Sequence, residues 1–281
     1  MDFKAYVKII RPSACSIIAV TTLIGQVLAL GNFPEQITAI TAFLSSFLLS
    51  ASSFTINDYV DYEIDLINTP YRPIPSGKIS RKEALRYGVA LGLAGGLSTL
   101  FLNPVAIIIG FTLYALTVFY TVKLKVYGFI GNIIVALSIA LYFVFGYSTI
   151  TSNISPYIIS ISSICFFYAL GGEVAQSIGD AEGDKMREVK SIANMRGPNT
   201  AAIVVSICYA LMAIMGAYTA KLFGIGNKYS SAMIISTIVI VGLITVPLLR
   251  NPSKKSAIRA RNVVNAFAIL IISGIFILLL I

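Results

Sequence analysis

Apolar residues in this chain are gathered into long runs that alternate with short polar segments. Residues 37–56 form one run of bilayer length, and further runs cover 203–220, 231–249 and 267–281. Roughly 20 mostly apolar residues are needed for a helix to cross about 30 Å of hydrocarbon. Polar segments and an Asn-Pro break separate the runs and predict nine helices, at 12–31, 37–57, 84–102, 104–121, 128–149, 156–179, 200–222, 231–249 and 262–281.

This pattern predicts an all-α polytopic membrane protein, a bundle of about nine transmembrane helices that forms a single domain over residues 1–281. Composition agrees, because 57% of the residues are hydrophobic and only 12% are charged, whereas about a quarter of the residues of a soluble domain are charged. The first apolar run, 12–30, is too long for the core of a signal peptide and is expected to remain as a span.

Two residue types narrow the possible chemistry. The chain has no histidine, which excludes acid–base catalysis by imidazole, histidine metal ligands and haem ligation by histidine. Its cysteines, Cys15, Cys165 and Cys208, all lie in apolar runs without the spacing of a metal site, so we expect them to be small buried hydrophobic residues.

The basic residues predict the orientation in the membrane. With a cytoplasmic N-terminus, all but two of the 21 lysines and arginines, Lys221 and Lys228, fall in segments on the cytoplasmic side. This asymmetry follows the positive-inside rule and predicts a multi-pass protein of the plasma membrane with a cytoplasmic-facing active site. Nucleic acid is not expected as a partner, because the positive charge is divided among short loops. Nothing in the sequence predicts a protein partner.

Acidic residues cluster where predicted spans meet the same membrane face. The first cluster holds Asn57, Asp58, Asp61, Glu63 and Asp65. If the helix continues, Asp58, Asp61 and Asp65 lie at i, i+3 and i+7 and share one face. The second cluster holds Asp180, Glu182 and Asp184, and the same reasoning places Asp180 and Asp184 on one face at i, i+4.

Carboxylates stacked in this way repel one another unless a cation neutralises them. Mg²⁺ takes oxygen ligands, is held by one or two carboxylates, and completes its shell with water and substrate phosphates. The spacing does not follow a calcium-binding EF-hand. The clusters therefore predict Mg²⁺ and a diphosphate held between them. The alternative is a set of hydrated loop acids paired with nearby lysines and arginines.

A proline-rich segment follows the first cluster, from Asn68 to Ser80. Three prolines and Gly77 exclude a continuous helix and predict a shaped loop that can hold Arg72 and Lys78 over a phosphate. Ser80-Arg-Lys-Glu83 has the pattern of a capping box and predicts the start of the next helix.

These motifs resemble the signatures of the UbiA-type intramembrane prenyltransferases. The first signature is Asn57-Asp58-x-x-Asp61-x-x-x-Asp65 with Asn68 and Arg72-Pro-Ile-Pro-Ser-Gly-Lys-Ile-Ser80, and the second is Asp180-x-x-x-Asp184 after the sixth predicted span. Members of this family transfer an allylic prenyl group from its diphosphate to an acceptor. Within the family, the sequence looks most like the digeranylgeranylglyceryl phosphate synthases of archaeal lipid synthesis, although the basic residue that this branch commonly has upstream of the second motif is absent here.

The resemblance implies roles for individual residues. The Mg²⁺–diphosphate site would be formed by Asn57, Asp58, Asp61, Asp65, Asp180 and Asp184. Basic contacts to the diphosphate would come from Arg72, Lys123 and Arg11, and further contacts to the anionic substrates from Asn68, Lys78, Lys185 and Lys190. The reaction implied is Mg²⁺-dependent transfer of a geranylgeranyl group to the hydroxyl of geranylgeranylglyceryl phosphate, a lipidic acceptor.

Two residues inside predicted spans carry further hypotheses. Glu173 is an acid within a predicted span, where acids are costly and usually functional. It is therefore a candidate to accept the hydroxyl proton or to bind a basic partner; a position at the water interface is the alternative. Tyr142 is a candidate to offer its ring face to an allylic cation, and packing is the alternative role.

Three other functions fit parts of the sequence. An aromatic acceptor, as in quinone or haem O synthesis, is the alternative within the family. An anion or lipid transporter is the main rival outside it, but transporters place charge or broken helices near the midplane, where these spans have almost no ionisable residues. A purely structural or channel role lacks rings of like charge through the membrane.

Overall fold

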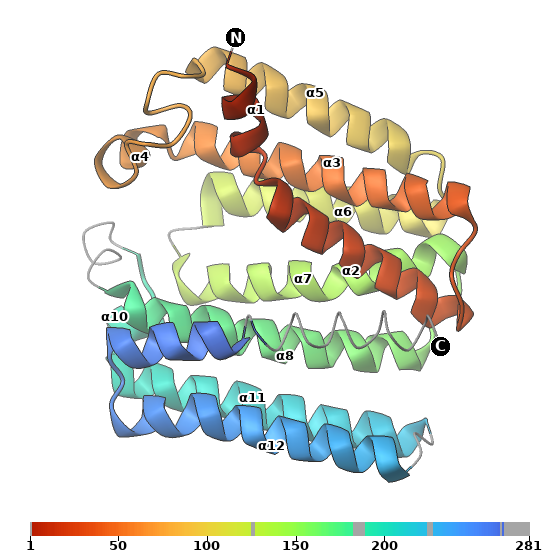
Figure 1. Ribbon diagram of the computed structural model, residues 1–281, viewed down its shortest axis with the longest axis vertical. Coiled ribbons are helices and arrows are strands. Elements are labelled where there is room, and N and C mark those ends of the chain that lie inside the picture. The colour runs from red at the N-terminus through yellow and green to blue at the C-terminus, as the bar shows by residue number, and fades with distance from the viewer. Residues whose placement is uncertain (1, 125–126, 182–188, 224–226, 265, 267–281) are drawn as a thin grey trace. The chain divides into compact units, whose positions relative to one another are not determined.

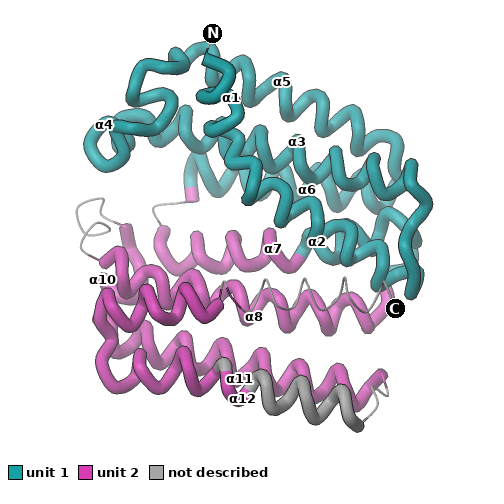
Figure 2. Tube along the Cα trace, in the orientation of Figure 1, with its two compact units in different colours: residues 1–123, 141–154 teal, residues 124–140, 155–281 magenta. Residues whose placement is uncertain are grey.

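This computed structural model describes residues 2–124, 127–181, 189–223, 227–264 and 266 (Figure 1). Within those ranges every regular element is helical, which confirms the all-α prediction. The chain forms two compact units, one from residues 1–123 and 141–154, the other from 124–140 and 155–281 (Figure 2). Helix α7, Phe129–Ile150, contributes residues to both units.

The first unit is built around one long helix, α3. Its other helices are the short α1 and α4 and the longer α2, α5 and α6. Helix α3 packs against α2, α5 and α6. The bounds are α1 Phe3–Ile9, α2 Pro12–Leu30, α3 Gln36–Val60, α4 Tyr62–Asn68, α5 Arg81–Thr99 and α6 Pro104–Phe119, which continues into a π-helical turn, Tyr120–Leu124.

The second unit is built around one long helix, α11. Helix α11 contacts α8, α10 and α12, and the core between them includes the fully buried side chains of Val174, Val205 and Tyr209. The bounds are α8 Pro156–Gly179, α10 Ile192–Arg196, α11 Pro198–Leu222 and α12 Asn227–Arg250. A further helix covers residues 254–264.

Most predicted helix boundaries agree with the structure to within a few residues. The predicted break at Asn103-Pro104 is confirmed, because the Asn103 side chain accepts hydrogen bonds from the N–H groups of Val105 and Ala106 and caps α6. The capping box at Ser80 and Glu83 is also confirmed and starts α5 at Arg81. One predicted boundary was wrong: the last helix was expected to begin at 262, whereas the structure has a helix over 254–264.

The predicted count of nine spans is not confirmed within the described residues. Six helices there are long and apolar enough to cross a membrane: Pro12–Leu30, Gln36–Val60, Pro104–Leu124, Phe129–Ile150, Pro156–Gly179 and Pro198–Leu222. Helix α5 is not among them, since its first two turns carry Arg81, Lys82, Glu83 and Arg86 and leave only a short apolar remainder. The predicted last span, 262–281, lies mostly outside the described residues.

A row of glycines on α5 allows that helix to approach α3 closely. Gly88, Gly92 and Gly95 stand at i, i+4 and i+7 and face α3, and a Cβ atom built on Gly95 would lie 2.9 Å from the backbone nitrogen of Leu49. Ser52 of α3 donates a hydrogen bond to the Gly88 carbonyl at 2.7 Å. Small residues serve this purpose in membranes, where helix association depends on close van der Waals packing and interhelical hydrogen bonds.

We expect Gly95→Ala to destabilise the protein, because its new methyl group meets backbone that cannot rotate away; overpacking of this kind costs about 1–3 kcal/mol. The control is Gly96→Ala on the same helix, where the nearest atom to a new Cβ is a ring carbon of Phe111 at 3.4 Å. That change should be neutral or stabilising, because Ala favours helix over Gly. Thermal unfolding in detergent measures both, and equal melting temperatures for the two variants would contradict the packing argument.

Candidate functional site

The first acidic cluster lies where α3 passes into α4. Helix-type hydrogen bonds continue through the junction, from the Asp61 N–H to the Asn57 carbonyl at 2.9 Å and from the Asp65 N–H to the Asp61 carbonyl at 2.8 Å. The near-helical spacing predicted for the three aspartates is therefore kept. Asp58, Asp61 and Asp65 are all buried, with 3%, 7% and 4% of their surface exposed.

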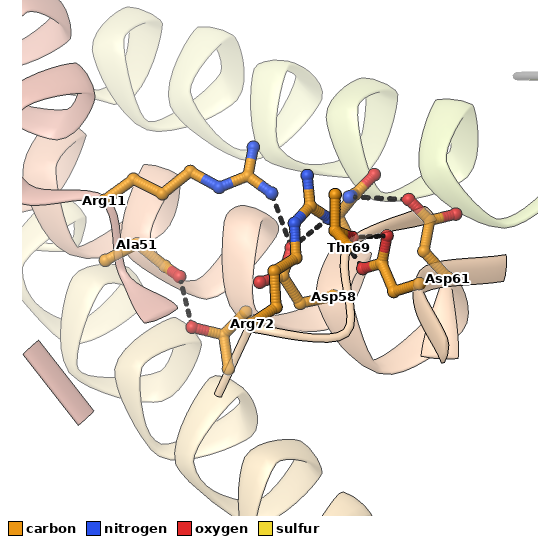
Figure 3. A network of polar contacts seen from close by, with 9 residues as sticks. Arg11, Ala51, Asp58, Asp61, Thr69 and Arg72 are labelled. Carbon is orange, nitrogen blue, oxygen red and sulfur yellow. Dashed lines mark hydrogen bonds and ion pairs between the residues drawn. The ribbon is translucent and has the colours of Figure 1, made fainter. Parts of the chain in front are cut away.

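Two arginines converge on these carboxylates (Figure 3). The Arg11 guanidinium donates a 2.5 Å hydrogen bond to Oδ1 of Asp58. Arg72 binds Oδ2 of Asp65 at 2.6 Å and reaches the same Oδ1 of Asp58 at 3.4 Å. Asp61 accepts a hydrogen bond from the Asn57 side-chain amide at 3.0 Å. The repulsion expected between carboxylates at this spacing is therefore offset here by the positive charges of Arg11 and Arg72.

Arg11 reaches the cluster from an unusual backbone position. It lies between α1 and α2 with φ 51° and ψ 64°, the left-handed region that non-glycine residues rarely adopt. Pro12 begins α2, and the residue before a proline disfavours the right-handed helical conformation. The chain therefore turns sharply at Arg11. Its guanidinium also lies over the Phe54 ring of α3, 5.1 Å from the ring centre.

The proline-rich segment forms a shaped loop without a continuous helix, as predicted, and it holds Arg72 in place. Ile74 and Ile79 of the loop are buried in a small apolar cluster with Ala5 and Ile9 of α1 and Ala84 of α5. Backbone hydrogen bonds within the loop run from Ser76 to Arg72 at 3.0 Å and from Ile79 to Pro73 at 3.2 Å. The loop is thus a packed element that carries its arginine toward the aspartates.

The charges of the cluster also act on Arg72. Partial burial lowers the pKa of its guanidinium, but the negative charge of Asp58 and the hydrogen bond and charge of Asp65 raise that pKa by more, so the net direction is upward. Arg72 is therefore charged throughout the physiological pH range. The stabilisation it supplies depends on the ionisation of its aspartate partners and falls as the pH drops through the range where carboxylates take up protons.

Part of the donor set for a divalent cation is present here. Asp58, Asp61 and Asp65 bring carboxylate oxygens, the ligands that Mg²⁺ prefers, to one short stretch of chain. Within the described ranges, however, no three side chains of His, Cys, Asp or Glu are grouped as a metal site by themselves. This fits Mg²⁺, which is usually held by only one or two carboxylates while water and substrate phosphates complete its shell.

The second acidic cluster begins at the end of α8. Asp180 is exposed and follows the last residue of that helix, where its N–H bonds to the Gln176 carbonyl at 3.1 Å. Glu173 lies half-buried two turns earlier on α8. Asp184 and Lys185 lie outside the described residues, so their predicted position remains a prediction.

The remaining residues predicted to contact substrate have different surroundings in the structure. Asn68, Lys78, Lys123 and Lys190 have exposed side chains, and the Lys123 ammonium lies 5.9 Å from the centre of the Phe119 ring. Tyr142 is buried with Phe145 and Leu113, and its hydroxyl shares a 3.1 Å hydrogen bond with Ser50. For Tyr142, the structure thus shows the packing contacts of the alternative hypothesis.

Sequence reasoning missed two members of the site. Thr69 donates a 2.7 Å hydrogen bond to Asp65. Its position four residues after Asp65 is the helical spacing that could have predicted this contact. Phe54 supports the Arg11 guanidinium. No local pattern connects Arg11 to Phe54 or to Asp58, which is 47 residues away along the chain.

We expect Arg72→Gln to destabilise the protein at neutral pH, because it leaves three buried carboxylates with one arginine. The loss of a charged hydrogen bond in this setting costs about 1–3 kcal/mol. The deficit should shrink on acidification from pH 7.5 to 5, as carboxylates that have lost their cation partner protonate more readily. Thermal unfolding at both pH values tests this.

Arg81→Gln is the matched control. Arg81 pairs with Glu63 at 3.4 Å, but the two side chains are 43% and 72% exposed, and such pairs contribute about 0–1 kcal/mol. An equal or larger loss in Arg81→Gln, or a deficit in Arg72→Gln that grows on acidification, would contradict the role given to Arg72.

Known proteins resemble this chain over almost its whole length. A sequence profile described as the UbiA prenyltransferase family matches residues 18–271. The digeranylgeranylglyceryl phosphate synthase of Thermococcus kodakarensis is 33% identical over 265 residues, which cover 93% of this chain and 92% of that protein.

Solved structures share the fold. One, from work on digeranylgeranylglyceryl phosphate synthase in membranes, superposes with a TM-score of 0.79 at 26% identity and covers 98% of this chain and 96% of that one. A UbiA homologue from Archaeoglobus fulgidus, solved with DMAPP and Mg²⁺ bound to it, has a TM-score of 0.74 at 23% identity, covering 95% and 99% of the two chains.

Proposed function

Because this chain belongs to the UbiA prenyltransferase family, we propose that it transfers a geranylgeranyl group from its diphosphate to the free hydroxyl of geranylgeranylglyceryl phosphate. The observation that carries the proposal is the set of three buried aspartates faced by Arg11 and Arg72 at the end of α3. The name and near-complete coverage of the Thermococcus relative support the choice of acceptor.

In the proposed reaction, the bond between the allylic carbon and the diphosphate oxygen breaks and the diphosphate leaves with the bonding electrons. The hydroxyl oxygen of the acceptor forms a new ether bond to that carbon, and the hydroxyl proton is released. Fixed positive charge lowers the barrier by stabilising the charge that develops on the leaving group.

The residues near the first cluster would divide this work. Asn57, Asp58, Asp61 and Asp65 would hold Mg²⁺ together with Asp180 and Asp184. The bound Mg²⁺ would supply Lewis-acid stabilisation of the diphosphate oxygens. Arg11 and Arg72, with 35% and 29% of their side chains exposed, remain accessible to the diphosphate and would bind its oxygens.

Other residues are assigned to the substrates. Asn68, Lys78, Lys123, Lys185 and Lys190 are proposed contacts for the anionic groups, and Glu173 is proposed to take the hydroxyl proton. Support for Glu173 comes from its half-buried position within an apolar helix, where an acid is costly unless it has a function.

The decisive assay supplies purified protein with labelled geranylgeranyl diphosphate, Mg²⁺ and geranylgeranylglyceryl phosphate. Transfer should require Mg²⁺ and stop with EDTA. Asp65→Asn should lower the rate at least about a hundredfold, because it removes a buried carboxylate bound to Arg72. Glu63→Gln, two residues away and largely exposed, should keep the wild-type rate. Metal-independent transfer, or full activity of Asp65→Asn, would refute the proposed site.

Acceptor choice is tested in the same assay by replacing the prenylglycerol phosphate with a polar aromatic acid. We expect no transfer to the aromatic compound. Transfer to it, with none to the lipid, would assign the chain to the quinone or haem O type of reaction instead.

We also propose that the N-terminus and the site loops face the cytoplasm across the plasma membrane, on the basis of the distribution of lysine and arginine. In intact cells, a membrane-impermeant maleimide should label Asn32→Cys and should label Lys82→Cys only after permeabilisation. Both positions are exposed in the structure. The reverse labelling pattern would overturn this orientation.

A further inference from the structure

The helix over 254–264 packs against the end of α8 that carries Asp180. A Cβ atom built on Gly179 would lie 3.3 Å from the Ala257 Cβ, and one built on Gly172 would lie 3.7 Å from a methyl group of Val264. The Tyr168 hydroxyl of α8 also donates a hydrogen bond to the Val264 carbonyl. Since the residue numbers rise on one helix as they fall on the other, the two helices run antiparallel along a seam of small residues.

This register shows which residues of the two helices stand at the same level. Positions 257, 261 and 264 lie on one stripe of their helix at i, i+4 and i+7, and positions 172, 176 and 179 do so on α8. Arg261 and Gln176 therefore stand at about the same level, between the two glycine contacts. Both side chains are exposed, although Ala257 and Ala260 beside Arg261 are buried.

Among the described residues, no lysine or arginine forms an ion pair with the polar residues of α8 at this level. Glu173, Gln176 and Asp180 follow one another at i, i+3 and i+7, and α8 itself contains no lysine or arginine. Among the residues that the structure describes, none forms an ion pair with Arg261. The seam thus brings an available guanidinium to the level of the half-buried Glu173.

We infer that Arg261 binds the phosphate of the lipid acceptor and selects acceptors that carry a phosphate monoester, an assignment that rests on the proposed function. A guanidinium binds phosphate oxygens through two parallel hydrogen bonds. By the register, Glu173 stands at the level of position 263, so Arg261 lies two residues along its helix from the level of Glu173. An acceptor whose phosphate is bound by Arg261 has its glycerol hydroxyl a few bonds away, within reach of this acid. Arg261 is therefore a specificity-determining residue that acts on the acceptor and not on the prenyl diphosphate.

The chain offers a matched control on the same helix. Arg259 is also exposed, but at about 100° per residue it points about 200° away from Arg261 around the helix. A general effect of positive charge on lipid binding would involve both arginines. Binding of the acceptor phosphate at the seam involves Arg261 alone.

Kinetics on Arg261→Gln, Arg261→Lys and Arg259→Gln test the inference. Arg261→Gln should raise the KM for geranylgeranylglyceryl phosphate about tenfold to a hundredfold, the effect of losing charged hydrogen bonds. Its KM for the prenyl diphosphate should stay within about twofold. Arg261→Lys should show an intermediate KM for the acceptor, because the charge remains without the bidentate geometry. Arg259→Gln should match the wild type, and an unchanged acceptor KM in Arg261→Gln, or an equal rise for the donor, would overturn the assignment.

Direct binding separates this inference from the reaction. A radiolabelled dialkylglycerol phosphate has the phosphate monoester but no free hydroxyl, so it binds without reacting. The wild type in neutral detergent should bind it, and Arg261→Gln should bind it at least about tenfold more weakly. An excess of phosphatidylglycerol, a phosphodiester lipid, should not displace it. Displacement by the diester would show that the site takes bulk anionic lipid and would overturn the assignment.

The two claims can fail independently. If the wild type transfers no prenyl group to any acceptor while Arg261 still governs binding of the phosphate monoester, the proposed function fails and the site stands. If the wild type is active and Arg261→Gln keeps both its acceptor KM and its binding, the site fails and the proposed function stands. Thermal unfolding of each variant shows whether it folds. If Arg261→Gln has a folding defect, the acceptor KM and the lipid binding of Arg261→Lys test the assignment instead.

Discussion

Neutralisation of buried negative charge is the constraint on which the first unit depends. Asp58, Asp61 and Asp65 lie within two helical turns and are almost fully buried, an arrangement that is unfavourable unless cations reach them. Arg11 and Arg72 supply this charge from two separate segments. The sharp turn before α2 and the packed loop before α5 therefore serve one purpose, to bring a guanidinium to the end of α3.

The same arginines connect structure to the proposed chemistry. A group of three carboxylates and two guanidiniums has a small net charge without ligand, yet it contains the oxygen donors for Mg²⁺ and the hydrogen-bond donors for a diphosphate. Both arginines remain about one-third exposed, so substrate oxygens can reach them. Ion pairs within the protein and contacts to the substrate would then involve the same side chains.

Small residues determine where polar groups lie in both units. In the first, the glycine row of α5 lets α3 approach closely, and Ser52 uses this closeness for a hydrogen bond to the Gly88 carbonyl. In the second, Gly179 lets the helix over 254–264 lie close against α8, since a Cβ atom there would be 3.3 Å from the Ala257 Cβ, and Arg261 then stands at about the level of Gln176. In membranes, close approach of this kind replaces much of the hydrophobic driving force that associates helices in water.

The features that depend on local pattern could be predicted from the order of residues alone. Apolar runs located most helices to within a few residues, Asn103-Pro104 and the Ser80–Glu83 capping box located two boundaries, and helical spacing placed three aspartates together. The count of nine spans is not confirmed by the six membrane-length helices of the described residues, partly because the apolar part of α5 is short and partly because 262–281 lies mostly outside those residues. The apolar pattern also placed the start of the last helix at 262, whereas the structure has a helix over 254–264.

Contacts between groups far apart in the chain could not be predicted in this way. Four such features join distant segments of the chain. They are the ion pair between Arg11 and Asp58, the contact of Phe54 with Arg11, the packing of the loop isoleucines against α1 and α5, and the position of Arg261 beside α8. Local propensity acts over a few residues, whereas such contacts depend on how whole helices pack. The sequence therefore predicts which residue types can bind a diphosphate. The partners that hold those side chains in place depend on how the surrounding helices pack.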